Sequence, residues 1–169
     1  KSTARLDGDK WILNGTKIFI TNSATPITLG STVQVISGEN NGKPEFTTFL
    51  MENDTPGFTQ EPMNRKMMWR ASNTGKLTFN NVELPKENML GAPGQGSHIM
   101  LATLDGGRLS IAAMALGCAQ GAYEMALAYS KEREQFGKQI CKFQAVSFKL
   151  ADMAMKIEAA RCLLYKACR

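Results

Sequence analysis

Residues 131–144, KEREQFGKQICKFQ, carry side chains suited to binding a phosphate group and an aromatic ring. The candidates are, in chain order, Arg133, Gln135, Phe136, Phe143 and Gln144. A guanidinium matches two phosphate oxygens at once, while Gln and Phe side chains can contact a ribose or a heterocycle. Residue types alone also describe a solvent-exposed turn between helices, capped by Gly137, and they favour that simpler interpretation.

Residues 18–24, IFITNSA, form a β-type run that ends in small polar side chains. Phe19 can stack on a flat heterocycle, and Thr21 and Asn22 can form hydrogen bonds at its edge. A strand that runs into a loop has the same composition, because loop starts favour Asn and Ser. Taken alone, the segment favours the strand end.

Residues 104–113, LDGGRLSIAA, place Asp105 and Arg108 on one face of a predicted helix. Between them, Gly106 and Gly107 each cost a helix about 1 kcal/mol relative to alanine. Either the segment holds a simple ion pair, or the missing side chains let a ligand approach the helix between two polar groups. The residues leave both interpretations equally open.

Metal and dinucleotide sites are not indicated by the sequence. The stretch GAPGQG at residues 91–96 precedes a helix but lacks the G-x-G-x-x-G spacing. The four cysteines form no C-x-x-C pair and His98 has no neighbour of ligand type, so no metal site is predicted. Cysteines in helical patterns act mostly as small apolar residues, which favours a reducing compartment.

The segments that position these residues fall into two parts with different periodicity. From 1 to 91, short β-type runs alternate with turn dipeptides such as Asp7-Gly8 and Asn14-Gly15, each typical of a type I′ hairpin. We expect an antiparallel β barrel or sandwich of about six to eight strands here.

From 92 to 169, apolar residues recur at spacings of three and four. A helix of about 35 residues and a second one after it predict a long antiparallel helical hairpin, joined by the 131–144 segment. The apolar seams are too long for two helices to cover, so further helices are expected to pack against the hairpin. The fold class is therefore α+β with two domains, 1–91 and 92–169, and the uncapped end at Arg169 indicates a fragment.

Composition and charge indicate a globular protein. The chain has 169 residues, 43% of them hydrophobic, and a net charge of +5. Its cations are scattered, which favours a solvated surface over binding of nucleic acid or of a phosphate-bearing cofactor. A signal peptide and an uninterrupted apolar run of membrane-spanning length are absent, so a soluble protein is expected.

Several ordered stretches together resemble one family. They are LNGTKIFITNS, ENDTPGF, RASNTGKLTFNNVELPKENMLG and LDGGRLSIAAMALGCAQGAYEMALAYSKEREQFGKQ. From residue 7 to the end the chain is similar to the flavin-dependent acyl-CoA dehydrogenases, whose members have a helical N-terminal domain, a middle β domain and a C-terminal four-helix domain. The resemblance implies a middle domain, truncated at its N-terminus, followed by the first two C-terminal helices.

The resemblance implies an FAD-dependent oxidoreductase of fatty acid metabolism that desaturates acyl-CoA thioesters. A carboxylate takes the α-proton, and the β-hydrogen leaves as hydride to the flavin. It further implies a homo-oligomer, a dimer or homotetramer, with an electron-transfer flavoprotein as acceptor and with no nucleic-acid or membrane partner. The location would be the bacterial cytoplasm or, in a eukaryote, the mitochondrial matrix.

The flavin site that the resemblance implies comes from two motifs. The family's W-I-T stretch lies against the isoalloxazine and matches Phe19, Ile20 and Thr21, so that a phenyl ring replaces the indole. The R-x-[TQ]-F-G motif reaches the flavin's pyrophosphate and adenosine across a dimer interface. Its matches, together with two later residues that line the same cofactor, are Arg133, Gln135, Phe136, Phe143 and Gln144.

The substrate segment that the resemblance implies borders the pantetheine and nucleotide of the CoA thioester and matches Asp105, Gly106, Gly107 and Arg108. Some branches of the family carry the glutamate base at the position of Gly107. Glycine rules out that placement, so the base is expected beyond Arg169. We therefore expect no catalytic residue within this chain, and we expect the chain alone to be inactive.

Two alternatives stay open at this point. An acyl-CoA oxidase on the same scaffold would pass its electrons to oxygen, and a non-catalytic assembly or nucleic-acid-binding module would use the positive charge. Flavin absorbance in the full-length protein favours an enzyme, whereas salt-sensitive DNA binding favours the module.

Overall fold

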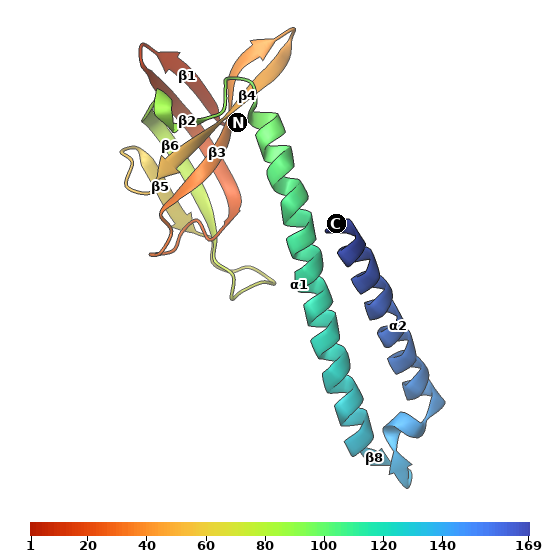
Figure 1. Cartoon of the computed structure of the whole chain (residues 1–169). Helices are drawn as coiled ribbons and strands as arrows, with labels where there is room; N and C mark the ends of the chain where they lie inside the picture. Colours follow the sequence, from red (N-terminus) through yellow and green to blue (C-terminus); the bar gives the residue numbers. More distant parts are fainter. The chain divides into compact units, whose positions relative to one another are not determined.

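The computed structural model describes all residues from 1 to 169, which form two compact units (Figure 1). One unit runs from Lys1 to Ala102 and the other from Thr103 to Arg169. We call them the β unit and the helical unit and describe each by itself. The division falls inside a continuous helix, later than the change of periodicity near residue 91.

The β unit contains seven strands in one sheet, ordered β5-β6-β2-β1-β3-β4-β7. The strands are β1 (Thr3–Asp7), β2 (Lys10–Thr21), β3 (Gly30–Asn40), β4 (Lys43–Glu52), β5 (Phe58–Pro62), β6 (Thr74–Pro85) and β7 (Met89–Leu90). A short 3-10 helix, η1 (Lys86–Asn88), precedes β7. All pairings are antiparallel except one, a parallel contact of β1 with β3 through Thr3 and Ile36. The expected α+β class is confirmed, with this parallel contact as a departure from an antiparallel sheet.

The sheet folds over a single apolar core. Trp11 on β2 and Phe49 on β4 meet edge to face with ring centroids 5.3 Å apart. These strands are three positions apart in the sheet order, which in a flat sheet would separate them by about 14 Å. The sheet therefore curls until its distant strands share one interior, where Leu13, Val82 and Phe49 are fully buried.

The turn signals of the sequence were only partly right. Asn41 and Gly42, both at positive φ, form the two-residue type I′ turn between β3 and β4. The β1–β2 loop is Gly8-Asp9, with positive φ at Gly8 alone, and is not a type I′ turn. Asn14-Gly15 makes no hairpin: it lies inside β2 at a register shift against β6.

A distant partner explains the behaviour of Asn14. Its side-chain amide donates to Asn81 Oδ1 at 3.0 Å, and its Oδ1 accepts from the Asn81 backbone N–H at 2.9 Å. Gly15 has φ 131°, and a Cβ there would lie 2.6 Å from the Cα of Ser2. The dipeptide therefore makes a β-bulge that accommodates the N-terminal segment.

The helical unit is an antiparallel hairpin, as predicted. Helix α1 (Gly96–Glu132), whose first turns belong to the β unit, is followed by β8 (Glu134–Gln135), β9 (Lys138–Gln139), η2 (Ile140–Lys142) and α2 (Gln144–Ala167). The two helices lie side by side (Figure 1), and Arg161 on α2 donates to Gln120 Oε1 on α1 at 2.9 Å. Only Ile157 among their apolar residues is buried.

Helix α1 also meets the length and composition criteria of a membrane-spanning helix, with a mean hydropathy of 1.4 over its most apolar window. These criteria average hydropathy over a window and tolerate charged residues, so they differ from the uninterrupted apolar run that the sequence lacks. A helix that is apolar around much of its surface equally suits the interior of a helical bundle.

Candidate functional site

The end of β2 presents Phe19 to solvent. Its backbone has φ 61°, its side chain is 68% exposed, and the β2–β6 register shifts between Lys17 and Ile20. Ile20 instead packs against the apolar core. This irregularity turns an aromatic ring outward beside a strand residue that stays anchored, an arrangement that suits stacking on a planar ligand.

The chain after β2 is held by hydrogen bonds. Ser23 is buried, and its hydroxyl donates to the Ile20 carbonyl at 2.9 Å. Asn73 accepts from the Ala24 N–H and donates to the Ala24 carbonyl, both at 3.1 Å. The residues that follow Phe19–Thr21 therefore fix the position of this strand end.

The 131–144 segment contains a hairpin that sequence reasoning missed. Strands β8 and β9 pair through Glu134–Gln139 and Gln135–Lys138, so that Phe136 and Gly137 form the turn. Both have positive φ, 52° and 76°, as a type I′ turn requires. The expected helix-capping role of Gly137 is wrong, because the helix ends before the hairpin.

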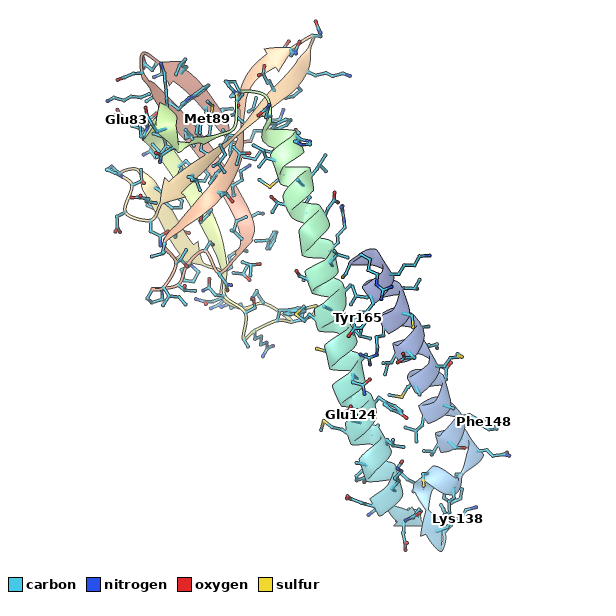
Figure 2. All side chains as sticks on the ribbon, viewed as in Figure 1. Glu83, Met89, Glu124, Lys138, Phe148 and Tyr165 are labelled. Carbon is cyan, nitrogen blue, oxygen red and sulfur yellow. The ribbon has the colours of Figure 1, made fainter.

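The hairpin displays an aromatic and cationic surface. Phe136 is 92% exposed and meets Phe143 edge to face at 6.2 Å between centroids. Lys138 Nζ lies 4.4 Å above the Phe143 ring, and Figure 2 shows Lys138 at the hairpin end of the helical unit. The structure thus brings together the predicted residues at this end: Arg133, Gln135, Phe136, Phe143 and Gln144.

Arg133 is exposed and takes part in no ion pair, although glutamates flank it on both sides. Its backbone N–H donates to the Tyr129 carbonyl at 2.9 Å, and its carbonyl accepts from Ile140 at 2.9 Å. The backbone is therefore fixed between helix and hairpin, and the guanidinium is available to an anionic ligand.

Asp105 and Arg108 do form the ion pair that their spacing predicted, and both are exposed. Cβ atoms added at Gly106 and Gly107 would meet nothing within 4 Å, so this face of α1 is open to a close approach. Arg108 lies about 36 Å along α1 from Glu132, at 1.5 Å per residue. One copy of α1 therefore cannot bring the Asp105–Arg108 segment and the β8–β9 hairpin to the same ligand.

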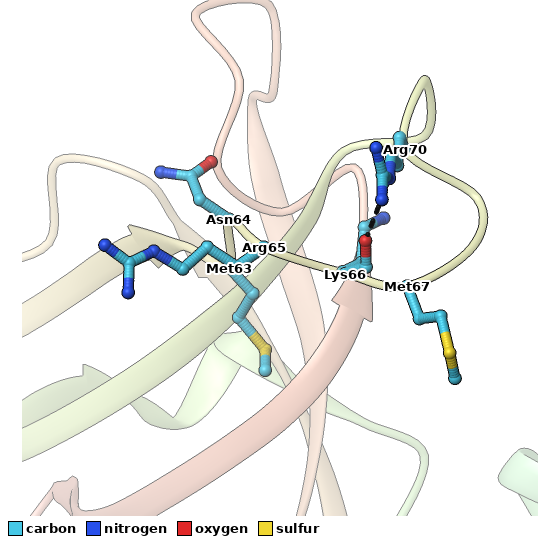
Figure 3. A pocket seen from close by; sticks show the side chains of 6 residues that line it. All are labelled: Met63, Asn64, Arg65, Lys66, Met67 and Arg70. Atoms are coloured by element: carbon cyan, nitrogen blue, oxygen red, sulfur yellow. Dashed lines mark hydrogen bonds between the residues drawn. The ribbon is translucent and has the colours of Figure 1, made fainter.

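Sequence reasoning also missed a loop between β5 and β6. Its residues Met63, Asn64, Arg65, Lys66, Met67 and Arg70 line an open hollow of about 540 Å³ (Figure 3). The signal was present as three adjacent apolar residues, Met67 to Trp69, that belong to no periodic element.

Comparison with known proteins gives matches along nearly the whole chain. Residues 1–82 match the family model described as "Acyl-CoA dehydrogenase, middle domain", and residues 94–169 match "Acyl-CoA dehydrogenase, C-terminal domain". A short-chain specific acyl-CoA dehydrogenase of Megasphaera elsdenii is 50% identical over 162 residues, which cover 95% of this chain and 42% of that protein. The chain thus spans less than half the length of this relative.

Comparison with solved structures points to the same family. Butyryl-CoA dehydrogenase from Megasphaera elsdenii superposes with a TM-score of 0.92 at 47% identity, covering 99% of this chain and 44% of that one. A chain from a study of the electron transferring flavoprotein of Acidaminococcus fermentans gives 0.90 at 48% identity, covering 98% and 43%. With two models of one family matching successive parts of the chain, this protein belongs to the acyl-CoA dehydrogenase family.

Proposed function

We propose that this chain is part of an FAD-dependent enzyme that converts the Cα–Cβ single bond of an acyl-CoA thioester to a double bond. The observation that carries the proposal is the β8–β9 hairpin, which displays an unpaired Arg133 beside Phe136 and Phe143 at one end of the helical unit. In domain terms, residues 1–91 would be the middle β domain and 92–169 the first two helices of the C-terminal domain.

The residues present fit a flavin dinucleotide. Phe19, with Ile20 and Thr21 beside it, would lie against the isoalloxazine, where its exposed ring can stack. Arg133 would hold the pyrophosphate, and the other contacts with the dinucleotide would come from Gln135, Phe136, Phe143 and Gln144. A bound flavin supplies the hydride acceptor of the reaction.

The length of α1 supports a homo-oligomer. The Asp105–Arg108 segment, proposed to border the CoA thioester, lies about 36 Å from the hairpin along one helix. The hairpin would therefore hold the cofactor of a second copy, as in a dimer or homotetramer.

The chemistry at the substrate needs a base that removes the α-proton. Gly107 provides none, and the carboxylate would come from a residue outside this chain. Gly106 and Gly107 leave room for the thioester, and Asp105 and Arg108 offer polar contacts beside it. The names of the relatives support a short acyl chain and a protein electron acceptor, and the bacterial sources of the relatives are compatible with the expected cytoplasmic location.

Removing the Arg133 guanidinium tests the flavin site. We expect Arg133→Ala in the full-length protein to weaken flavin binding roughly tenfold or more, because a charge-assisted contact to phosphate is lost. The measurement is flavin content per subunit by absorbance, together with flavin affinity by titration.

Lys149→Ala, which removes an exposed cation of α2, is the control and should retain its flavin. Equal flavin content in wild type and Arg133→Ala would return the hairpin to a solvent-exposed turn. Rapid reoxidation of the substrate-reduced enzyme in air, in preference to a protein acceptor, would favour the oxidase.

A further inference from the structure

The loop between β5 and β6, residues 63–73, carries three cations and no acidic residue. We call it the basic loop. None of its cations, Arg65, Lys66 and Arg70, takes part in any ion pair of the chain. The loop therefore presents a positive surface that no carboxylate of the chain neutralises.

The same loop exposes three consecutive apolar side chains. Met67 is 90% exposed, and Met68 and Trp69 are 67% and 58% exposed. Isolated exposed apolar residues are common on protein surfaces, but three in succession are not needed for folding. Met, Trp and Arg are the residue types enriched where proteins bind one another.

Hydrogen bonds hold the basic loop in a defined conformation, so the exposure of its apolar side chains does not result from an unconstrained backbone. Lys66 Nζ donates to the Ser72 carbonyl and, at 2.7 Å, to Thr74 Oγ1. The Arg70 Nε–H donates to the Lys66 carbonyl at 3.2 Å. Trp69 adopts φ 56°, an uncommon conformation for a bulky residue that the surrounding structure must hold in place.

The position of the basic loop links it to the candidate flavin site. It ends at Thr74, which pairs with Thr21, and the next pair is Gly75 with Ile20. The loop thus leaves the sheet beside the strand end that displays Phe19. Each desaturation removes two electrons and two protons from the acyl chain, and the electrons must leave the enzyme through an acceptor.

We propose that the basic loop is the docking surface for an acidic face of the protein electron acceptor, a proposal that rests on the proposed function. Its cations attract carboxylates, Met67 and Trp69 offer apolar contacts, and the hollow can admit a side chain of the partner. An anionic membrane would offer the same negative charge as an acidic protein face. The side chains of Arg65 and Met67 diverge from the loop (Figure 3), which suits a partner with an uneven surface better than a flat membrane.

Charge reversal tests the docking surface in the full-length enzyme. We expect Arg65→Glu/Arg70→Glu to raise the Kd for a purified electron-transferring flavoprotein, measured by calorimetry, by about tenfold or more. Turnover with a small artificial electron acceptor should not change. The wild-type Kd should rise with ionic strength, and that of the double variant should not.

Apolar truncation provides a second arm. Met67→Ser should weaken the same binding, whereas Ile27→Ser, at a residue 88% exposed in another loop, should not. Lys86→Glu, which reverses a single charge elsewhere on the β unit, is the charge control. Thermal unfolding midpoints should be similar in all variants, since the altered side chains are exposed and Arg70→Glu removes only one surface hydrogen bond, that to the Lys66 carbonyl.

Each remaining outcome overturns the proposal or its basis. Unchanged Kd in the double variant, or equal losses in Lys86→Glu, would remove the basic loop as a docking surface. Binding to anionic lipid vesicles that depends on the loop, without binding to the flavoprotein, would assign it to a membrane. Failure of the wild-type enzyme to reduce the small acceptor with acyl-CoA would instead contradict the proposed function itself.

Discussion

The β unit and the helical unit bury their apolar side chains to very different extents. Thirteen of the fourteen buried apolar residues lie between Ala4 and Leu84, whereas the helices contribute Ile157 alone. Both units nevertheless follow a clear periodic pattern of apolar residues. The β unit closes over its own interior, while the helices keep apolar surface that suits packing against further protein.

Core truncation in the β unit should have the largest effect. Phe49→Ala should lower the free energy of unfolding by about 3–5 kcal/mol, because a fully buried ring that contacts Trp11 is lost. Leu163→Ala on α2, at a residue 69% exposed, should cost less than about 1 kcal/mol. Denaturant unfolding followed by tryptophan fluorescence and circular dichroism measures both, and equal losses would break the contrast between the units.

A smaller effect is expected where the β unit is tightly packed beside the candidate site. A Cβ at Gly75 would lie 2.3 Å from Ser23 Oγ, the hydroxyl that ties the end of β2. Gly75→Ala should therefore cost about 1–3 kcal/mol through overpacking. It should also weaken flavin binding, and Gly117→Ala on α1, where nothing lies within 4 Å, is the control. Equal stability of the Gly75 variant and wild type would show that Ser23 moves without cost.

The helical unit buries only one apolar residue, and a polar contact joins its two helices. Arg161 joins Gln120 on α1 to Glu158 on its own helix. Arg161→Met should lower the thermal midpoint by less than Gly75→Ala, and its effect should depend on whether residue 120 is Gln or Leu. A double-mutant cycle measures that coupling. The control is Lys156→Met, which removes an exposed ion pair and should lower the free energy of unfolding by about 0.3–0.5 kcal/mol. Additive effects would mean that the contact does not join the helices.

The smallest effect concerns Lys17, a half-buried residue of β2. Burial lowers the pKa of its ammonium below 10.5. Below the lowered pKa, Lys17 is protonated in both the folded and the unfolded chain, so the full cost of burying its charge is present. As the pH rises towards about 10.5, the folded chain loses this proton before the unfolded chain does, and the cost of burial decreases. Lys17→Met should thus be more stable than wild type near neutral pH, by a margin that narrows in alkali. Unfolding curves recorded from neutral to alkaline pH measure this difference in stability, with Lys43→Met as the control. A difference that stays constant across these pH values would contradict the expectation.

The sequence predicted the secondary-structure elements better than the contacts between them. Local periodicity was enough for the α+β class, for the strand-rich first half and for two long helices. It could not reveal that Asn14 binds Asn81, because a contact between residues so far apart leaves no local pattern. The parallel contact of Thr3 with Ile36 is hidden for the same reason.

At the candidate site, residue types indicated which side chains are exposed but not how the backbone presents them. Phe136 would not be expected at positive φ, since Asn, Asp and Gly dominate type I′ turns. The roles of Phe19, Asp105 and Arg133 remain predictions. The loop at residues 63–73 lacks periodicity, so its shape depends on contacts such as Lys66 with Thr74 that only the fold reveals.

The pairing of β2 with β6 also has a consequence for synthesis on the ribosome. Trp11 pairs with Leu84, so the central strands of the sheet cannot meet until most of the first half of the chain has emerged. Until then, the β1–β2 hairpin must carry Trp11 and Leu13 without their cover. Long-range pairing of this kind is slow and leaves strand edges open to association. The core residues of the β unit, which are buried in the finished protein, are therefore exposed while the chain is being made.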